Sequence, residues 1–124
     1  MAGFSNNHYM FGKPTRFYSN KQEKHIAKAV SGKQVTNSGA TPFCKGDVTT
    51  DNWLFEAKTK TKESDSFSIK REWLEKNKEE AFAMRKDYNA LVLDFGDGKQ
   101  FYVIDEKTFL TMKGALENGD NTSI

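Results

Sequence analysis

Two acids and a lysine lie close together in the stretch 46–60, which reads GDVTTDNWLFEAKTK. Asp47 comes first, Glu56 follows nine positions later, and Lys58 comes two positions after Glu56. A pair of carboxylates used without histidine or cysteine suits Mg²⁺ better than Zn²⁺, because Mg²⁺ prefers oxygen ligands. A lysine beside such a pair can orient or help to deprotonate an attacking water, and can stabilise charge on a phosphate. The spacing therefore predicts Mg²⁺-assisted chemistry at a phosphate group.

A β-hairpin would bring the two acids together. The run 49–52 is prone to form a turn, and a run rich in β-forming residues restarts at Trp53. With the last two residues of the run 49–52 at the centre of the turn, antiparallel pairing sets Asp47 opposite Glu56, with Cβ atoms roughly 4.5–5.5 Å apart. Two ionised carboxylates at that separation repel each other, so we expect a cation between them.

The second strand of this hairpin has two different faces, because side chains alternate along a strand. One face is largely charged and carries Leu54, Glu56, Lys58 and Lys60. The other is largely apolar and carries Trp53, Phe55, Ala57 and Thr59. We expect the apolar face to anchor the strand in a core and so to hold Lys58 rigidly beside Glu56.

An acid followed by Glu-x-Lys on the next strand resembles the PD-(D/E)XK nuclease superfamily. Gly46-Asp47 matches the first half of its motif, with Gly46 where proline is usual, and Glu56-Ala57-Lys58 matches the second half. The order of a helix, a Ser-Gly loop, a hairpin, a helix and two strands over about 20–112 is most like the archaeal and phage Holliday-junction resolvases. This resemblance implies a single-domain α/β fold, with a central mixed β-sheet flanked by helices in a restriction-endonuclease-like core.

The resemblance also implies a function and a set of site residues. It implies a Mg²⁺-dependent DNA endonuclease that acts on branched DNA as a homodimer, with Mn²⁺ able to substitute and no organic cofactor. Asp47 and Glu56 would hold the metal ion, the main-chain carbonyl of Ala57 would be a further ligand, and Lys58 would serve the attacking water. In resolvases of this family a helix glutamate completes the metal site, and Glu23 would take that role here.

Glu23 also has a purely structural interpretation. We expect a helix from Lys21 to about Val30, opened by Ser19-Asn20, with Glu23 on the same stripe as its apolar residues. The spacing Asn20-x-x-Glu23 fits a capping box, in which the carboxylate would only accept a bond from a main-chain N–H. Both interpretations remain open at this point.

Several further residues are candidates for DNA contact. The small residues Ser38 and Gly39 would let main-chain N–H groups approach a phosphate, although such a loop can equally be only a connection. The basic candidates are Lys45, Lys60, Lys70 and Arg71. The formal charge of the chain is only +2, so any affinity for nucleic acid must come from how these charges are arranged.

The remaining elements are predicted from periodicity and capping residues. A long helix from Ser68 to about Lys86 would place Ile69, Trp73, Ala81, Met84 and Tyr88 on its apolar stripe. Its glutamates, Glu80 included, are interpreted as part of a solvated, salt-bridged face. Strands are expected at 90–95 and 100–104. Asp105 would cap a last helix that docks through Phe109, Leu110 and Met112.

Length and composition predict one domain, with an N-terminal arm at 1–18, the nuclease-like domain at 19–113 and a flexible tail at 114–124. The single cysteine, Cys44, excludes a disulfide within one chain, and no apolar run is long enough to span a bilayer. An intracellular protein, in the cytoplasm or the nucleoid and without a membrane partner, is the simplest expectation.

Two alternatives to a junction resolvase stay open. A nicking, mismatch or restriction-type endonuclease on duplex DNA would use the same motif. A nucleic-acid-binding module without catalysis would use Asp47 and Glu56 only to form ion pairs with Lys58 and Lys45.

Overall fold

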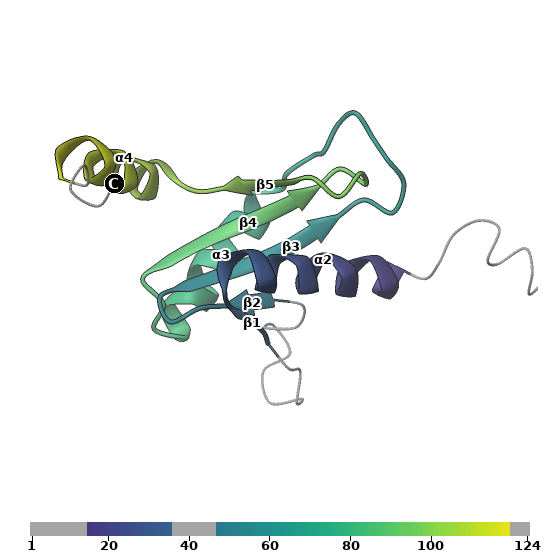
Figure 1. Cartoon of the computed structure of the whole chain (residues 1–124), viewed down its shortest axis with the longest axis horizontal. Coiled ribbons are helices and arrows are strands. Elements are labelled where there is room, and N and C mark those ends of the chain that lie inside the picture. Colours follow the sequence, from purple (N-terminus) through teal and green to yellow (C-terminus); the bar gives the residue numbers. More distant parts are fainter. Residues whose placement is uncertain (1–14, 36–46, 120–124) are drawn as a thin grey trace, which may run out of the picture.

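A mixed β-sheet forms the centre of the computed structural model, which describes residues 15–35 and 47–119 (Figure 1). Its five strands lie in the order β1-β2-β3-β4-β5. Their bounds are β1 Lys33–Gln34, β2 Asp47–Thr49, β3 Trp53–Thr59, β4 Tyr88–Asp94 and β5 Gln100–Val103. Neighbouring strands are antiparallel except β3 and β4, which are parallel.

The described helices are α2 Thr15–Val30, α3 Arg71–Ala83 and α4 Glu106–Asn118. Parallel strands cannot be joined by a tight turn, so the chain crosses from β3 to β4 through α3. Figure 1 shows α2 on the near face of the sheet and α3 behind it. The predicted fold class, an α/β domain with a central mixed sheet flanked by helices, is confirmed.

An apolar core fills the space between α2 and the sheet. Ile26 of α2 is fully buried and packs against the predicted apolar face of the hairpin. The buried members of this core are Ile26, Val48, Phe55, Ala90 and Val92, with Trp53 and Ala57 packed against them. Burying one large apolar side chain contributes about 1.5–3 kcal/mol, so this layer stabilises the packing of α2 on the sheet.

The opposite face of the sheet, covered by α3, is mixed: Leu54, Leu91 and Leu93 are buried there, and so is the acid Asp47. The residues that α3 buries are Asn77, Glu80 and Ala81. Asn77 accepts a hydrogen bond from the side chain of Asn89 on β4, at 2.8 Å. Strand alternation places the charged face of β3 on this side, so the acids and Lys58 lie in the layer beneath α3.

Two helix starts differ from the sequence-based expectation. Helix α2 begins at Thr15 rather than Lys21, so residues 15–18, which were expected in the arm, form its first turn. Asn20 and Glu23 therefore lie inside the helix, and the capping-box interpretation of Glu23 is wrong. Helix α3 begins at Arg71 and ends at Ala83, with Lys70 rather than Ser68 as its N-cap.

The C-terminal elements were predicted in part. Strands β4 and β5 are confirmed, and Asp105 caps α4 by accepting a 2.8 Å hydrogen bond from the Thr108 N–H. The helix continues to Asn118, beyond the residue where a flexible tail was expected to begin. Its predicted docking residues do not dock: Phe109, Leu110 and Met112 are exposed, and α4 extends away from the sheet in Figure 1. Within the described ranges, no helix combines the length and apolar character needed to cross a bilayer.

Gly32, which follows α2, passes so close to the main chain of β2 that it has no room for a side chain. A Cβ atom at Gly32 would lie 2.5 Å from the carbonyl oxygen of Thr49 on β2, whereas a Cβ at Gly114 of α4 would meet nothing closer than 3.8 Å. We expect Gly32→Ala to lower the free energy of unfolding by about 1–3 kcal/mol through overpacking. Gly114→Ala, the control, should raise it by about 0.5–1 kcal/mol. Urea unfolding of both variants measures this, and equal stabilities would contradict the packing argument.

Candidate functional site

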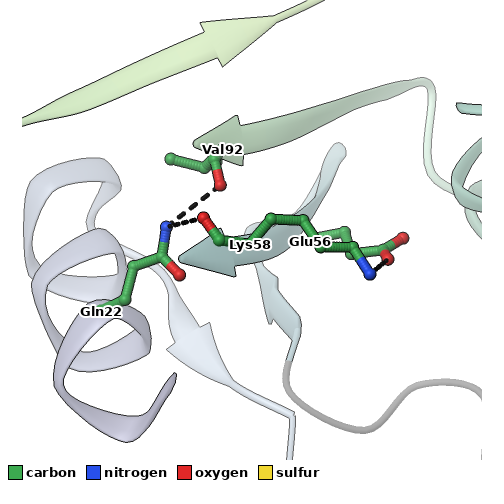
Figure 2. A network of polar contacts seen from close by, with 4 residues as sticks. All are labelled: Gln22, Glu56, Lys58 and Val92. Carbon is green, nitrogen blue, oxygen red and sulfur yellow. Dashed lines mark hydrogen bonds and ion pairs between the residues drawn. The ribbon is translucent and has the colours of Figure 1, made fainter. Parts of the chain in front are cut away.

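The hairpin register that sequence reasoning predicted is the one in the structure. Asp47 pairs with Glu56, and Val48 pairs with Phe55. Lys58 lies two residues after Glu56 on the same face of β3, and its ammonium is 3.1 Å from Glu56 Oε2. Figure 2 draws this ion pair. Asp47, Glu56 and Lys58 are thus brought together on the α3 face of the sheet.

These acids are buried and incompletely bonded. Asp47 is only 2% exposed, and Glu80 from α3 is only 5% exposed. Three buried carboxylate oxygens have no hydrogen-bond partner in the part of the chain that the structure describes: Asp47 Oδ2, Glu56 Oε1 and Glu80 Oε2. A buried polar atom without a partner costs about 1–3 kcal/mol, and more when charged, so the cluster is energetically incomplete as it stands.

Burial and mutual repulsion shift the ionisation of this cluster. Burial is the main cause that raises the pKa of Asp47 to about 9, and the charges of Glu56, Glu80 and Glu23 add to the shift in that order. Lys58 acts in the opposite direction but does not cancel them. Burial also raises the pKa of Glu80, again with Glu56 as the largest repulsive neighbour. The positive charge of Lys58 is therefore too small an effect to bring the pKa of Asp47 or Glu80 back to its ordinary value.

Glu80 is the site residue that sequence reasoning missed. It was interpreted as part of a solvated helix face, and that interpretation is wrong because the side chain is buried against the sheet. The spacing of Glu80 from other residues of the helix did indicate that it could face the sheet. Glu80 lies seven residues after Trp73 and three after Asn77, which puts it on the same helix face as both.

Glu23 reaches the site less directly. It is 6% exposed on α2, and its Oε1 accepts a 3.3 Å hydrogen bond from Gln34 Nε2 of β1. Burial raises its pKa, while the Gln34 bond and Arg16 act against the shift. Its effect on Asp47 is smaller than that of Glu80. Glu23 is thus a neighbour of the cluster, with one oxygen already engaged.

Aromatic rings lie under several of the basic side chains. The Lys58 ammonium lies 4.3 Å from the centre of the Trp73 ring, and Lys70 Nζ lies 5.9 Å from the same ring. Lys60 Nζ lies 5.2 Å from the centre of the Phe67 ring. Lys70 is therefore close to the acid cluster. Among the other predicted DNA contacts, Arg71 is exposed at the start of α3, whereas Ser38, Gly39 and Lys45 lie outside the described residues.

Gln22 of α2 fixes the main chain at Lys58 and was not identified from the sequence. Its Nε2 donates hydrogen bonds to the carbonyl oxygens of Lys58 and Val92, both at 3.0 Å (Figure 2), and approaches Gln100 Oε1 at the same distance. Gln22 is 3% exposed, so these bonds are formed away from water. The side chain connects α2 to β3 and β4 behind the lysine.

The donor atoms suit a hard divalent cation but do not enclose one. Carboxylate oxygens are the ligands that Mg²⁺ prefers, and the three unpartnered oxygens are unsatisfied acceptors of that kind. In the described ranges, however, no three acidic, histidine or cysteine side chains are arranged to hold a metal ion by themselves. A complete coordination sphere would need further oxygens, such as the Ala57 carbonyl predicted above, water or a phosphate.

Comparison of the chain with family models, with curated proteins and with solved structures finds no match.

The raised pKa of Asp47 predicts how stability depends on pH. Between its ordinary pKa of 3.8 and about 9, the folded chain keeps a proton on Asp47 that the unfolded chain has lost. The free energy of unfolding should therefore fall as the pH rises through this window. Asp47→Asn removes this proton, so its decline should be shallower, by at most about 1.4 kcal/mol per pH unit. Urea unfolding in chelator across the window measures both slopes. Asp51→Asn, at an exposed acid of the same hairpin, should show the same dependence of stability on pH as the wild type. If Asp47→Asn also shows the wild-type dependence, the pKa of Asp47 is not raised.

The bonds from Gln22 predict a second measurable effect. Gln22→Leu would leave the carbonyls of Lys58 and Val92 without this donor, and we expect a loss of about 1–3 kcal/mol in the free energy of unfolding. Lys24→Leu, which introduces the same side chain on the exposed face of α2, should change it by less than about 0.5 kcal/mol. Chemical denaturation measures both variants, and similar losses in the two would argue against the role of these bonds.

Proposed function

We propose that the chain is a Mg²⁺-dependent DNA endonuclease that hydrolyses phosphodiester bonds in branched DNA, as a Holliday-junction resolvase does. One observation carries the proposal. Asp47, Glu56 and Glu80 are packed beneath α3 around a single close lysine, with an unpartnered oxygen on each acid. A site that serves only stability would pair its buried charges, because each unpaired one is costly.

The motif and its surroundings support a cation as the missing partner. Asp47 and Glu56 would hold Mg²⁺, with Mn²⁺ able to substitute, and the Ala57 carbonyl would be a further ligand by resemblance to the PD-(D/E)XK nucleases. The bound ion would supply a Lewis acid for the scissile phosphate. Glu23, which already accepts a bond from Gln34, would act at the edge of this site.

The chain's own residues would position and polarise the reactants. Lys58 is held by Glu56, by the Trp73 ring and by the Gln22 bond to its carbonyl, so its ammonium has little freedom. An ammonium fixed in this way would donate to the attacking water or to a phosphate oxygen without reorganising during the reaction. Attack on phosphorus in line with the leaving 3′-oxygen would leave a 5′-phosphate.

DNA would approach along the side of the site where basic and aromatic residues alternate. Lys60 and Lys70 lie over aromatic rings, and Arg71 is exposed beside Lys70. Cations would contact phosphates. Ser38, Gly39 and Lys45, which lie outside the described residues, remain further candidates for DNA contact. Such contacts act on the backbone of DNA and fit recognition of its shape better than recognition of its sequence.

Resolution of a junction needs two cuts, so the proposal includes a two-fold homodimer that works inside the cell, in the cytoplasm or the nucleoid. Two-fold symmetry would present two identical sites to two strands. Exposed apolar side chains on β5 and α4, such as Phe101, Leu110 and Leu116, are candidates for the contact between the copies.

A binding module without catalysis is the second candidate, and the Lys58–Glu56 ion pair favours it. In that case the hairpin charges would neutralise one another and DNA would bind through the lysines alone. The pair accounts for only one oxygen of Glu56, however, and Asp47 and Glu80 each keep an oxygen that has no hydrogen-bond partner among the described residues. A binding module would bind junctions equally well in chelator and would never cut them.

Cleavage assays on four-way junction, flap, nicked and linear DNA test the proposal. We expect the full chain to cut the junction at symmetric positions with Mg²⁺ or Mn²⁺, and to cut nothing in chelator. Lys58→Ala should reduce the rate about 10²–10³-fold, because a fixed charge donor is lost. Asp47→Asn should also abolish most of the activity.

Lys99→Ala is the matched control, since Lys99 is an exposed lysine in the turn between β4 and β5 and belongs to neither the site nor the predicted DNA surface. It should cut like the wild type. Cleavage of linear duplex in preference to the junction would favour a restriction-type or nicking enzyme. Full activity in Lys58→Ala, or no cleavage by the wild type with either ion, would rule out the proposed catalysis.

A further inference from the structure

The carboxylate of Glu80 lies in a position that packing alone does not explain. The side chain is 5% exposed on the inner face of α3, and its Oε2 has no hydrogen-bond partner among the described residues. Glutamate is rarely buried in this way unless it is paired. An alanine or leucine at this position would cover the sheet without the cost of desolvating a carboxylate.

The charges around Glu80 do not supply a partner either. Lys76, one helical turn earlier, attracts the carboxylate, but the repulsion from Glu56 is larger than that attraction. Lys58 attracts it still less. Glu80 is therefore held against other acids by the fold of α3 on the sheet.

We propose that Glu80 supplies a further carboxylate ligand to the divalent cation held by Asp47 and Glu56, and so joins α3 to the hairpin through the ion. This inference rests on the proposed function and extends its metal site beyond the motif. Two side chains that are more than nine-tenths buried, Asp47 and Glu80, each have a carboxylate oxygen without a partner among the described residues, and both acids lie close enough to Glu56 to be repelled by it. With all three acids ionised and Lys58 protonated, these four groups carry a net charge of −2, which one divalent cation neutralises.

Binding would require the side chain of Glu80 to change its torsion angles. The acids do not enclose an ion as they stand, but a glutamate side chain has three rotatable bonds and can turn without movement of the helix. Glu56 keeps one free oxygen, Oε1, in the presence of the Lys58 contact. The ion would thus replace repulsion between α3 and β3 by attraction.

Manganese binding to the full chain, followed by electron paramagnetic resonance of free Mn²⁺, tests the inference. Glu80→Gln keeps the shape of the side chain but removes the charge, and we expect Mn²⁺ affinity to fall about 10–100-fold. Glu79→Gln is the matched control, because Glu79 is the exposed neighbour on the same helix, and its affinity should equal that of the wild type. In chelator, Glu80→Gln should be at least as thermally stable as the wild type, since it relieves repulsion.

The outcomes separate this inference from the proposed function. If Glu80→Gln binds Mn²⁺ as tightly as Glu79→Gln while Asp47→Asn binds weakly, Glu80 is not a ligand and the nuclease proposal stands. If the wild type binds Mn²⁺ through Glu80 but cuts no DNA, the ligand assignment stands and the nuclease proposal fails. If the wild type binds no Mn²⁺, both are overturned.

A measurement on the wild type covers the case in which Glu80→Gln does not fold. With ¹³C-labelled glutamate, substoichiometric Mn²⁺ should broaden the carboxyl signal of Glu80 as strongly as that of Glu56, and should leave Glu79 much sharper. Equal broadening of Glu79 and Glu80 would overturn the assignment.

Discussion

The packing of α3 on the sheet is constrained by like charges buried together. Asp47, Glu56 and Glu80 come from three different elements, and Lys58 compensates only part of their charge. Desolvation and repulsion both oppose ionisation there, which is why Asp47 keeps its proton to such a high pH. The described fold has to supply enough stability elsewhere to hold this layer closed.

Part of that stability comes from leucines buried in the same layer, Leu54, Leu91 and Leu93, and part from the other face of the same strands. Phe55 and Ala57 belong to the apolar layer under α2, while Glu56 and Lys58 between them belong to the polar layer under α3. A slip of one residue in the pairing of β2 with β3 would exchange the two faces and bury lysine where phenylalanine now packs. The apolar core therefore fixes the register, and the register fixes which charges meet.

A feature of the structure could be predicted from the sequence where it depends on residues that are near one another in the chain, and could not where it depends on contacts between distant segments. The pairing of Asp47 with Glu56 depends on one turn and on strand alternation, so it could be derived from the residues 47–58 alone. The burial of Glu80 could not, since which face of a helix is covered depends on the sheet it meets. The same reason applies to α4. Phe109 and Leu110 are apolar, but the sequence near them does not show whether another element covers them, and in the described fold both are exposed.

The hydrogen bonds of Gln22 could not be predicted from the sequence for a different reason. A glutamine on a helix carries no sequence signal for a bond to strand carbonyls 36 and 70 positions away. Its effect is nevertheless on Lys58, because it holds the main chain from α2 while Glu56 and Trp73 hold the ammonium on the other face. Lys58 is therefore held from both sides of the sheet.

Any cation that binds Glu56 would compete with the Lys58 ammonium for this carboxylate. The Glu56 and Lys58 side chains are 16% and 28% exposed, so their ion pair is partly screened and can be exchanged for stronger partners. A divalent cation on Glu56 would weaken the hold of this carboxylate on the Lys58 ammonium. The Trp73 ring would still keep that ammonium in place, because its attraction does not depend on the charge of Glu56. Under the proposed function, the ion would take over Glu56 and a phosphate would take over Lys58, so that each partner of the ion pair would exchange the other for a ligand.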